Sequence, residues 1–283
     1  MNLALSPDSL ARLEAAVDTA LVRADEGELR VLGYGEISLV LAWGDGDDAR
    51  ACKRLPPFAD EGCFERYRTS VERYLGVLEA AGVVPVETAV QAHRQADGRL
   101  VGYCVQPVLP EGSLLPDRLR TLGEDDAVAL FERVLARITG GVSPALGIDA
   151  QISNWAEVDG SLRYLDISTP LMRDEAGAEA LDTNLFLASL PWALRPLVRW
   201  VFLRAILDKY YDPRCAVVDL IGNLHKEQLQ ALVPAFLAAA AAHVEPAITE
   251  REVWSYYRED ARMWALLQVL RRADRWWQRA IRR

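Results

Sequence analysis

The spacing of hydrophobic residues changes from helical to alternating and back again within the first 110 residues. A helical pattern opens at residues 6–8 and places Leu10, Leu13 and Val17 on one face. Alternation then predicts five short strands, over residues 29–34, 38–43, 49–55, 86–95 and 99–108. A helix over residues 58–81, closed by Gly82, separates the third strand from the fourth. This part of the chain therefore predicts an antiparallel sheet with one long helix packed on it.

Beyond residue 110 the pattern is mainly helical. The expected elements are a helix over 124–139, short strands over 152–158 and 162–167, and an almost entirely helical stretch from residue 173 to the end. The fold class is therefore α+β. We expect an N-terminal lobe over residues 1–108 and a mainly helical C-terminal lobe over residues 109–283.

The composition narrows the classes of partner. Hydrophobic residues make up 51% of the 283 residues, which is enough for a substantial core. The net charge of -9 disfavours general binding of nucleic acid, because neutralising phosphates needs clustered Lys and Arg. It suits a cationic small molecule. The chain opens without a signal-peptide pattern, and no stretch of about twenty residues lacks charge, so we expect a cytoplasmic protein with no transmembrane segment.

Histidine and cysteine chemistry is not expected. The three histidines have no metal-ligand spacing, and the four cysteines include no C-x-x-C pair. This pattern disfavours a zinc site and a Ser-His-Asp triad.

The first candidate residues for chemistry lie in the predicted sheet. Gly33 and Gly35 stand at the first turn, where glycine lets backbone N–H groups approach phosphate oxygens, although such turns also occur without phosphate. Lys53 alternates with apolar residues in the third strand, which is also typical of a surface lysine. A lysine held by a helix glutamate can fix the phosphates of a nucleotide. Glu72 is the candidate partner, and the alternatives are Glu65, Glu79 and Glu87.

A second group of polar residues surrounds the two short strands after residue 147. Asp149 and Asn154 stand five positions apart in an irregular segment, and Asp166 follows the second strand. Asn and Asp oxygens suit Mg²⁺, which takes few protein ligands and shares the rest with phosphates. A separate Asp can orient or accept the proton of an attacking hydroxyl. Taken singly, each residue also fits a turn or a helix cap, so the combination carries the prediction.

The order of these motifs resembles the protein-kinase-like superfamily, and its aminoglycoside phosphotransferase and choline kinase branch in particular. The resemblance runs from about residue 29 to residue 169, and residues 82–86 are similar to a Gly/Pro-Val-Pro entry found in that branch. It implies a bilobal fold with a five-stranded antiparallel N-terminal lobe. It also implies transfer of the γ-phosphoryl group of ATP, with Mg²⁺, to a hydroxyl of a small molecule.

The resemblance assigns roles to ten residues. The nucleotide-binding residues would be Gly33, Gly35, Lys53, Glu72 and, in the hinge that meets adenine, Gln106 and Val108. The catalytic residues would be Asp149 and Gln151, and the metal ligands would be Asn154 and Asp166.

Two departures from the family pattern keep other functions open. Ser38 replaces the third loop glycine, and Gly147 stands where the family has a histidine that makes a structural hydrogen bond. A catalytically silent kinase-like binding or scaffold protein is one alternative. An enzyme of the same fold that transfers AMP is another.

The last part of the chain gives two further hypotheses. Asp174, Glu175 and Glu179 could receive a cationic acceptor or simply form a solvated loop. Residues 256–283 form a predicted helix rich in Trp and Arg, which could contact an anionic membrane or an acidic partner. The ordinary alternative is a helix whose tryptophans pack on the lobe while its arginines stay solvated.

Overall fold

The structure is a computed structural model that describes residues 3–23, 29–34, 39–181 and 207–263. The chain divides into two compact units. We call residues 1–73 and 86–110 the sheet unit, and residues 74–85 and 111–283 the helical unit. The division falls at Pro110 rather than at residue 108, and it assigns the end of the long helix to the helical unit.

The sheet unit contains the five-stranded antiparallel sheet that the sequence predicts. Its strands are β1 (Arg30–Tyr34), β2 (Leu39–Trp43), β3 (Arg50–Phe58), β4 (Ala89–Arg94) and β5 (Leu100–Pro107), in the order β1-β2-β3-β5-β4. β3 runs three residues beyond its predicted end. Its pairing with β5 shifts between Arg54 and Pro57, where two consecutive prolines lack the N–H that a regular ladder needs.

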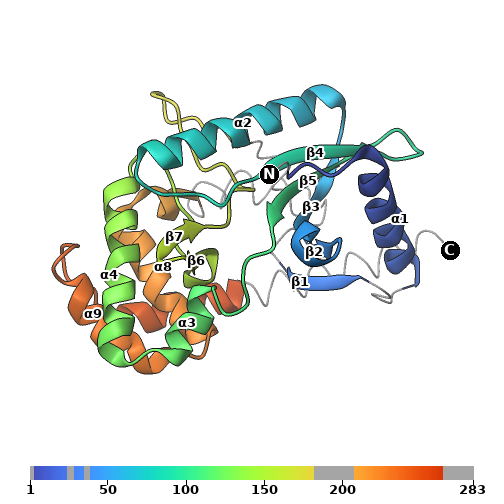
Figure 1. Cartoon of the computed structure of the whole chain (residues 1–283). Coiled ribbons are helices and arrows are strands. Elements are labelled where there is room, and N and C mark those ends of the chain that lie inside the picture. Colours follow the sequence, from blue (N-terminus) through green and yellow to red (C-terminus); the bar gives the residue numbers. More distant parts are fainter. Residues whose placement is uncertain (1–2, 24–28, 35–38, 182–206, 264–283) are drawn as a thin grey trace. The chain divides into compact units, whose positions relative to one another are not determined.

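Two helices cover the two faces of this sheet (Figure 1). α1 (Pro7–Arg23) packs Leu10, Leu13 and Val17 against the face that includes Cys52. α2 (Glu61–Ala80) covers the other face, where Tyr67 lies 3.6 Å from the sulfur of Cys104. α2 starts three residues later than predicted because Phe58 still belongs to β3, where its ring packs on α2.

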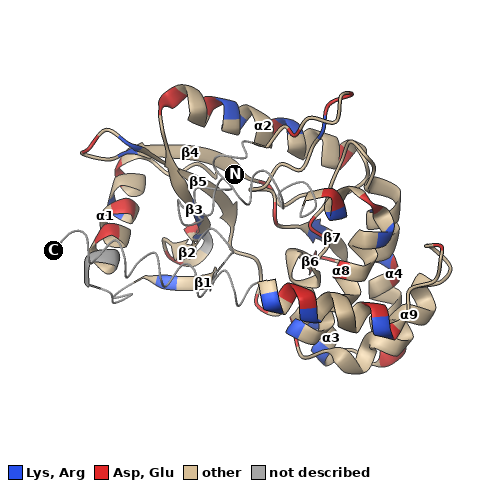
Figure 2. Ribbon diagram, turned by 180° about the vertical axis from the view of Figure 1, so that it is seen from behind, with Lys and Arg blue, Asp and Glu red and all other residues tan. Residues whose placement is uncertain are grey.

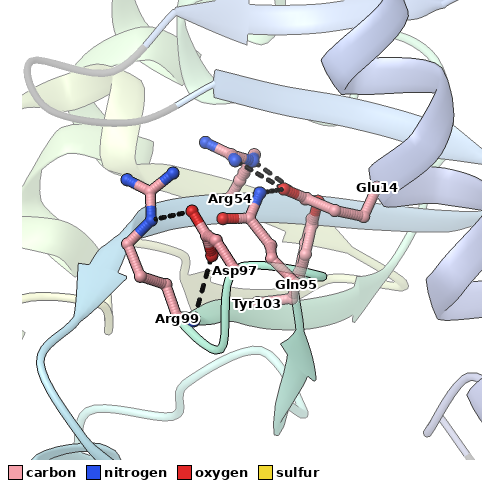
Figure 3. A network of polar contacts seen from close by, with 6 residues as sticks. All are labelled: Glu14, Arg54, Gln95, Asp97, Arg99 and Tyr103. Atoms are coloured by element: carbon pink, nitrogen blue, oxygen red, sulfur yellow. Dashed lines mark hydrogen bonds and ion pairs between the residues drawn. The ribbon is translucent and has the colours of Figure 1, made fainter.

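α1 also carries a buried carboxylate into the sheet unit (Figure 3). The Glu14 side chain is 2% exposed and accepts hydrogen bonds from Arg54 Nη2 at 2.6 Å, Gln95 Nε2 at 2.7 Å and the hydroxyl of Tyr103. Burial by itself raises the pKa of Glu14, but the hydrogen bonds from Arg54 and Tyr103 outweigh it, so this pKa lies below its ordinary value. The network ties α1 to β3 and β5.

The helical unit is built around three packed helices and a hairpin. Its elements are α3 (Leu115–Thr121), α4 (Glu124–Gly141), β6 (Trp155–Val158), β7 (Ser161–Tyr164), α8 (Pro213–Lys226), α9 (Val233–Ala240) and helical residues 250–263. Phe131 of α4 stacks on Phe236 of α9 with ring centroids 4.0 Å apart. Asp212 caps α8 by accepting from the backbone N–H of Cys215 at 2.7 Å, and Pro213 occupies the first turn.

The prediction of a nearly continuous helical stretch after residue 173 is wrong for residues 174–181. These residues form a turn. The Asp174 carboxylate accepts from the backbone N–H groups of Ala176 and Ala178, which competes with helix formation. Glu179 pairs with Arg173 at 2.6 Å and accepts from the hydroxyl of Tyr211. Asp174 and Glu179 are thus engaged in local structure rather than offered to a cation.

Charged residues of both signs are interspersed along α2, α3 and α4 (Figure 2). Several form ion pairs, such as Arg118 and Arg133 with Glu157 at 3.1 Å and 2.5 Å. Within the part of the chain that the structure describes, no helix is both long and apolar enough to span a bilayer. The α+β fold class is confirmed, and its five-stranded sheet and helical unit fit the protein-kinase-like fold.

Candidate active site

The segment that carries Asp149 is fixed by its backbone. The N–H of Gly147 donates to Leu171 O at 2.9 Å, and the N–H of Ile148 donates to Tyr210 O at 3.1 Å. These two bonds tie the segment to chain on either side of it. A loop held this way presents the side chain that follows, Asp149, in a defined direction.

Gly147 has no room for a side chain. A Cβ at this position would lie 3.0 Å from Cβ of Leu171 and 3.2 Å from the carbonyl oxygen of Tyr210. Atoms this close to backbone cannot be relieved by a rotamer change. The close packing is the physical reason why a histidine, which the resemblance predicts here, does not fit this chain.

Two buried tyrosines contact the same segment. The hydroxyl of Tyr74, from the last turns of α2, donates to Gly147 O at 2.9 Å. The N–H of Asp149 donates to the hydroxyl of Tyr164, the last residue of β7, at 3.1 Å. Both tyrosines are fully buried. Burial and then the charge of Asp166 and of Asp149 raise the pKa of Tyr74.

Asn154 is oriented by Asp149. The Nδ2 atom of Asn154 donates to the backbone carbonyl of Asp149 at 3.2 Å. Because a carbonyl can only accept, the amide nitrogen must face it, so Oδ1 of Asn154 is turned away from that carbonyl. An oxygen presented in this way is suited to binding a cation.

Asp166 lies beside Asn154. The backbone N–H of Leu165 donates to Asn154 O at 2.8 Å, and the N–H of Ile167 donates to Leu165 O at 3.0 Å, which makes a tight turn at Asp166. Oδ1 of Asp166 accepts from the hydroxyl of Ser168 at 3.0 Å. Asp149 and Asp166 both raise the pKa of Tyr164, after the larger effects of burial and Tyr74. Because Trp155 pairs with Tyr164, Asn154 and Asp166 flank the same end of the β6–β7 hairpin, and Asp149 contacts Asn154 and Tyr164 there.

Gln151 points toward α8. Its Oε1 atom accepts from Asn223 Nδ2 at 3.4 Å and from Lys226 Nζ at 3.3 Å. Asn223 also accepts from the N–H of Ser153 at 3.4 Å. These contacts link the loop to α8, and the catalytic role of Gln151 stays a prediction.

Lys53 lies on the sheet face that α2 covers. Its neighbours across the ladder are Val40 of β2 and Cys104 of β5, and Cys104 contacts Tyr67 of α2. Lys53 is half-buried there, rather than an exposed surface lysine. This placement is compatible with phosphate binding, which stays a prediction.

Glu72 does not face the sheet. Its side chain is 61% exposed, and its carboxylate lies 4.0 Å from Arg68 Nε on the same helix. The buried side of α2 is formed by Phe64, Tyr67, Val71, Tyr74 and Leu78. A residue one position after Val71 is rotated about 100° from that side. The described contacts therefore place Glu72 beside Arg68 and not beside Lys53, and Glu65 also pairs with Arg68.

The remaining nucleotide-binding candidates are spread over the sheet unit. Gly33 lies in β1 opposite Val40, next to an irregularity in the pairing, and a Cβ there would meet no atom within 4 Å. Gln106 is the last residue but one of β5 and donates to the hydroxyl of Thr88 at 3.0 Å, and Val108 follows that strand. Gly35 lies outside the described residues, as do Ser38 and the Trp-rich residues 264–283.

The donor set in the helical unit suits Mg²⁺ better than a soft metal. Among the described residues no three His, Cys, Asp or Glu side chains cluster as they would in a protein-only metal site. Mg²⁺ does not need such a cluster, because one or two protein oxygens and the phosphates of a nucleotide complete its coordination. Oδ1 of Asn154 and the carboxylate of Asp166 would be the protein ligands.

Sequence reasoning missed the two tyrosine hydroxyls. Tyr74 and Tyr164 fit their apolar patterns, which predict burial but say nothing about hydrogen bonds. Buried tyrosine hydroxyls generally find a partner. The sequence therefore offered two signals for these hydrogen bonds. One was this general rule, and the other was the glycine at position 147, where the resemblance predicts a histidine.

This chain has the kinase-like fold class. The features that define it are the strand order, the long helix α2 and the helical unit with its β6–β7 hairpin. The chain belongs to DUF6206, a family of unknown function whose profile matches residues 12–275. No curated protein matches it. A solved chain described as "WaaP in complex with acyl carrier protein" is 14% identical, covering 93% of this chain and 99% of that one, with a TM-score of 0.44. That superposition is loose, so the fold class rests on this chain's own elements.

Proposed function

We propose that this protein is an ATP- and Mg²⁺-dependent phosphotransferase that acts on a hydroxyl group of a small molecule, in the manner of aminoglycoside phosphotransferases and choline kinases. The observation that carries the proposal is the orientation of Asn154. Its amide nitrogen is held by the carbonyl of Asp149, and its backbone carbonyl is held by Leu165, next to Asp166. Asn154 thus links the candidate catalytic aspartate, through its side-chain amide, to the residue before the candidate metal ligand Asp166, through its backbone carbonyl.

The three residues have separate tasks in this proposal. Asp149 orients the acceptor hydroxyl and takes up its proton as the oxygen bonds to the γ-phosphorus and ADP leaves. Asn154 and Asp166 would hold Mg²⁺, which would supply neutralisation of phosphate charge. Lys53 is the candidate phosphate-binding lysine. Phosphoryl transfer depends mainly on such positioning and charge.

The acceptor in this proposal is a small molecule. Two residues after Asp166 the chain reaches Ser168, whose hydroxyl donates back to the Asp166 carboxylate. It then forms the turn at 174–181. A cationic acceptor is favoured by the net charge of -9 rather than by Asp174 or Glu179, which are engaged locally.

The test measures Mg²⁺-ATP affinity by calorimetry and nucleotide products by chromatography, with pools of amino-sugar and amino-alcohol acceptors. Asp166→Asn is expected to weaken Mg²⁺-ATP binding by about tenfold or more, which corresponds to about 1.4 kcal/mol. Asp149→Asn is expected to keep that affinity and to lower turnover by about 10²-fold or more. Asp159→Asn is the matched control, because Asp159 occupies the exposed β6–β7 turn with a positive φ of 50°, which asparagine tolerates.

The products distinguish the alternatives. ADP supports the phosphotransferase, whereas pyrophosphate with an AMP-modified acceptor supports AMP transfer. A parent protein that binds no nucleotide with Mg²⁺ or Mn²⁺, with and without the acceptor pools, would make it a silent binding module. Full activity in Asp149→Asn would remove the catalytic role of that residue.

A further inference from the structure

Two tyrosine hydroxyls close a ring of hydrogen bonds around Asp149. The N–H of Asp149 donates to the oxygen of Tyr164, and the hydroxyl of Tyr74 donates to Gly147 O. The hydroxyl of Tyr74 gives its one proton to Gly147 O, so toward the hydroxyl of Tyr164 its oxygen can only accept. Each group thus donates to the next, from the N–H of Asp149 to the carbonyl of Gly147.

The two hydroxyls lie in buried surroundings close to negative charge. Burial, followed by the charges of Asp166 and Asp149, keeps the pKa of Tyr74 above its ordinary value, and burial also raises the pKa of Tyr164. Both phenols are therefore neutral at neutral pH. Hydrogen bonds arranged head to tail strengthen one another in a medium of low dielectric constant.

Tyr164 also connects the ring to neighbouring chain. Its backbone N–H donates to Val84 O at 2.9 Å, and it forms a bridge with Pro85. Its ring packs on Trp155, with centroids 5.2 Å apart. Asp166 follows two residues later. The residue whose hydroxyl accepts from the N–H of Asp149 is therefore itself fixed on several sides.

We propose that Tyr74 and Tyr164 act as one unit that positions Asp149 for phosphoryl transfer. Gly147 cannot carry a side chain of its own for this purpose. The hydroxyl of Tyr74 reaches its carbonyl from α2, and the hydroxyl of Tyr164 reaches the N–H of Asp149 from β7. Neither tyrosine touches a reacting group. Their contribution is to hold the loop, and displacements of about 1 Å are known to cost about 10²-fold in rate. The inference rests on the proposed phosphotransferase function.

The test compares Tyr74→Phe, Tyr164→Phe and the double variant with the parent protein. Tyr103→Phe is the matched control, because Tyr103 is equally buried and its hydroxyl bonds to Glu14 in the sheet unit. Amide hydrogen exchange at Asp149 is followed by NMR, and ADP formation gives kcat and KM for ATP. Tyr74→Phe is the decisive variant, because the acceptor for the N–H of Asp149 stays in place.

We expect Tyr74→Phe and Tyr164→Phe each to speed exchange at Asp149 by about tenfold or more. Each should lower kcat with KM for ATP unchanged, and the double variant should be no worse than the poorer single one. Tyr103→Phe should change neither quantity. Unchanged exchange at Asp149 in Tyr74→Phe would overturn the proposal, as would additive losses of kcat. Because exchange needs no ATP, a protein without phosphotransferase activity would disprove the function while exchange still decides whether the tyrosines hold the loop.

Discussion

The side-chain nitrogen of Asn154 lies 3.2 Å from the carbonyl oxygen of Asp149. This contact makes an amide, and not a carboxylate, the group that fits position 154. A carboxylate would place an oxygen against the carbonyl oxygen, and both groups can only accept hydrogen bonds at neutral pH.

Replacing Asn154 by aspartate should destabilise the protein. We expect Asn154→Asp to lower the free energy of unfolding by about 1–3 kcal/mol at pH 7, because a hydrogen bond is lost and two acceptors face each other. Urea denaturation measures the change. The matched control is Gln151→Glu, which places its new charge beside Lys226 and should change stability by less than about 0.5 kcal/mol. Equal losses in the two variants would contradict the assigned orientation of Asn154.

Adding a methyl group at Gly147 should disturb the loop. Gly147→Ala would set a Cβ 3.0 Å from Cβ of Leu171, so we expect a loss of about 1–3 kcal/mol in thermal or urea unfolding. Gly140→Ala is the control, since Gly140 is an exposed residue of α4 and a Cβ there meets nothing within 4 Å. That variant should be stabilised by about 0.5 kcal/mol. A stable Gly147→Ala protein would mean that the packing around the loop yields easily.

Removing the charge of Glu14 should be costly. The Arg54 side chain is only 18% exposed, and in Glu14→Gln it would lose its counter-charge. We therefore expect a loss of about 3 kcal/mol in the free energy of unfolding. Arg99→Gln breaks the neighbouring ion pair with Asp97, whose side chains are 59% and 51% exposed, and should cost less than about 1 kcal/mol (Figure 3). Similar losses in both variants would show that burial of Glu14 does not matter.

The same carboxylate should make stability depend on pH in acid. The pKa of Glu14 is lowered on folding from an ordinary value of 4.5, so its contribution is complete above that value and falls as pH drops toward the folded pKa. The difference in unfolding free energy between the parent and Glu14→Gln should therefore shrink as the pH is lowered from about 6 to about 3. Denaturant titrations at several pH values measure it. A constant difference would show that Glu14 has an unshifted pKa.

The elements of the sheet unit could be predicted because their signals are local. Each strand alternates, and the helix that begins near residue 61 has a regular apolar face. Glu72 shows how far this reasoning extends. The apolar positions Val71 and Tyr74 already define the buried side of α2, so helix geometry alone turns Glu72 toward solvent. The order of motifs favoured Glu72 as the partner of Lys53, whereas the periodicity of the same helix did not.

Other features could not be predicted because their partners are distant in the chain. Tyr74 and Gly147 are 73 residues apart, and Glu14 and Tyr103 are 89 residues apart. From sequence, Glu14 is one more charged residue in an amphipathic helix. Periodicity reports which side of an element is buried, and it carries no information on which polar groups meet there.

The position of α1 has a practical consequence for protein engineering. A shortened protein that began at the first strand would lose the helix that covers Leu41, Cys52, Val101 and Val105. Those side chains would form an open hydrophobic sheet face, and Arg54 would remain there without Glu14. Sheets with such faces tend to aggregate. Recombinant versions intended for crystallisation or for nucleotide-binding assays should therefore retain residues 7–23.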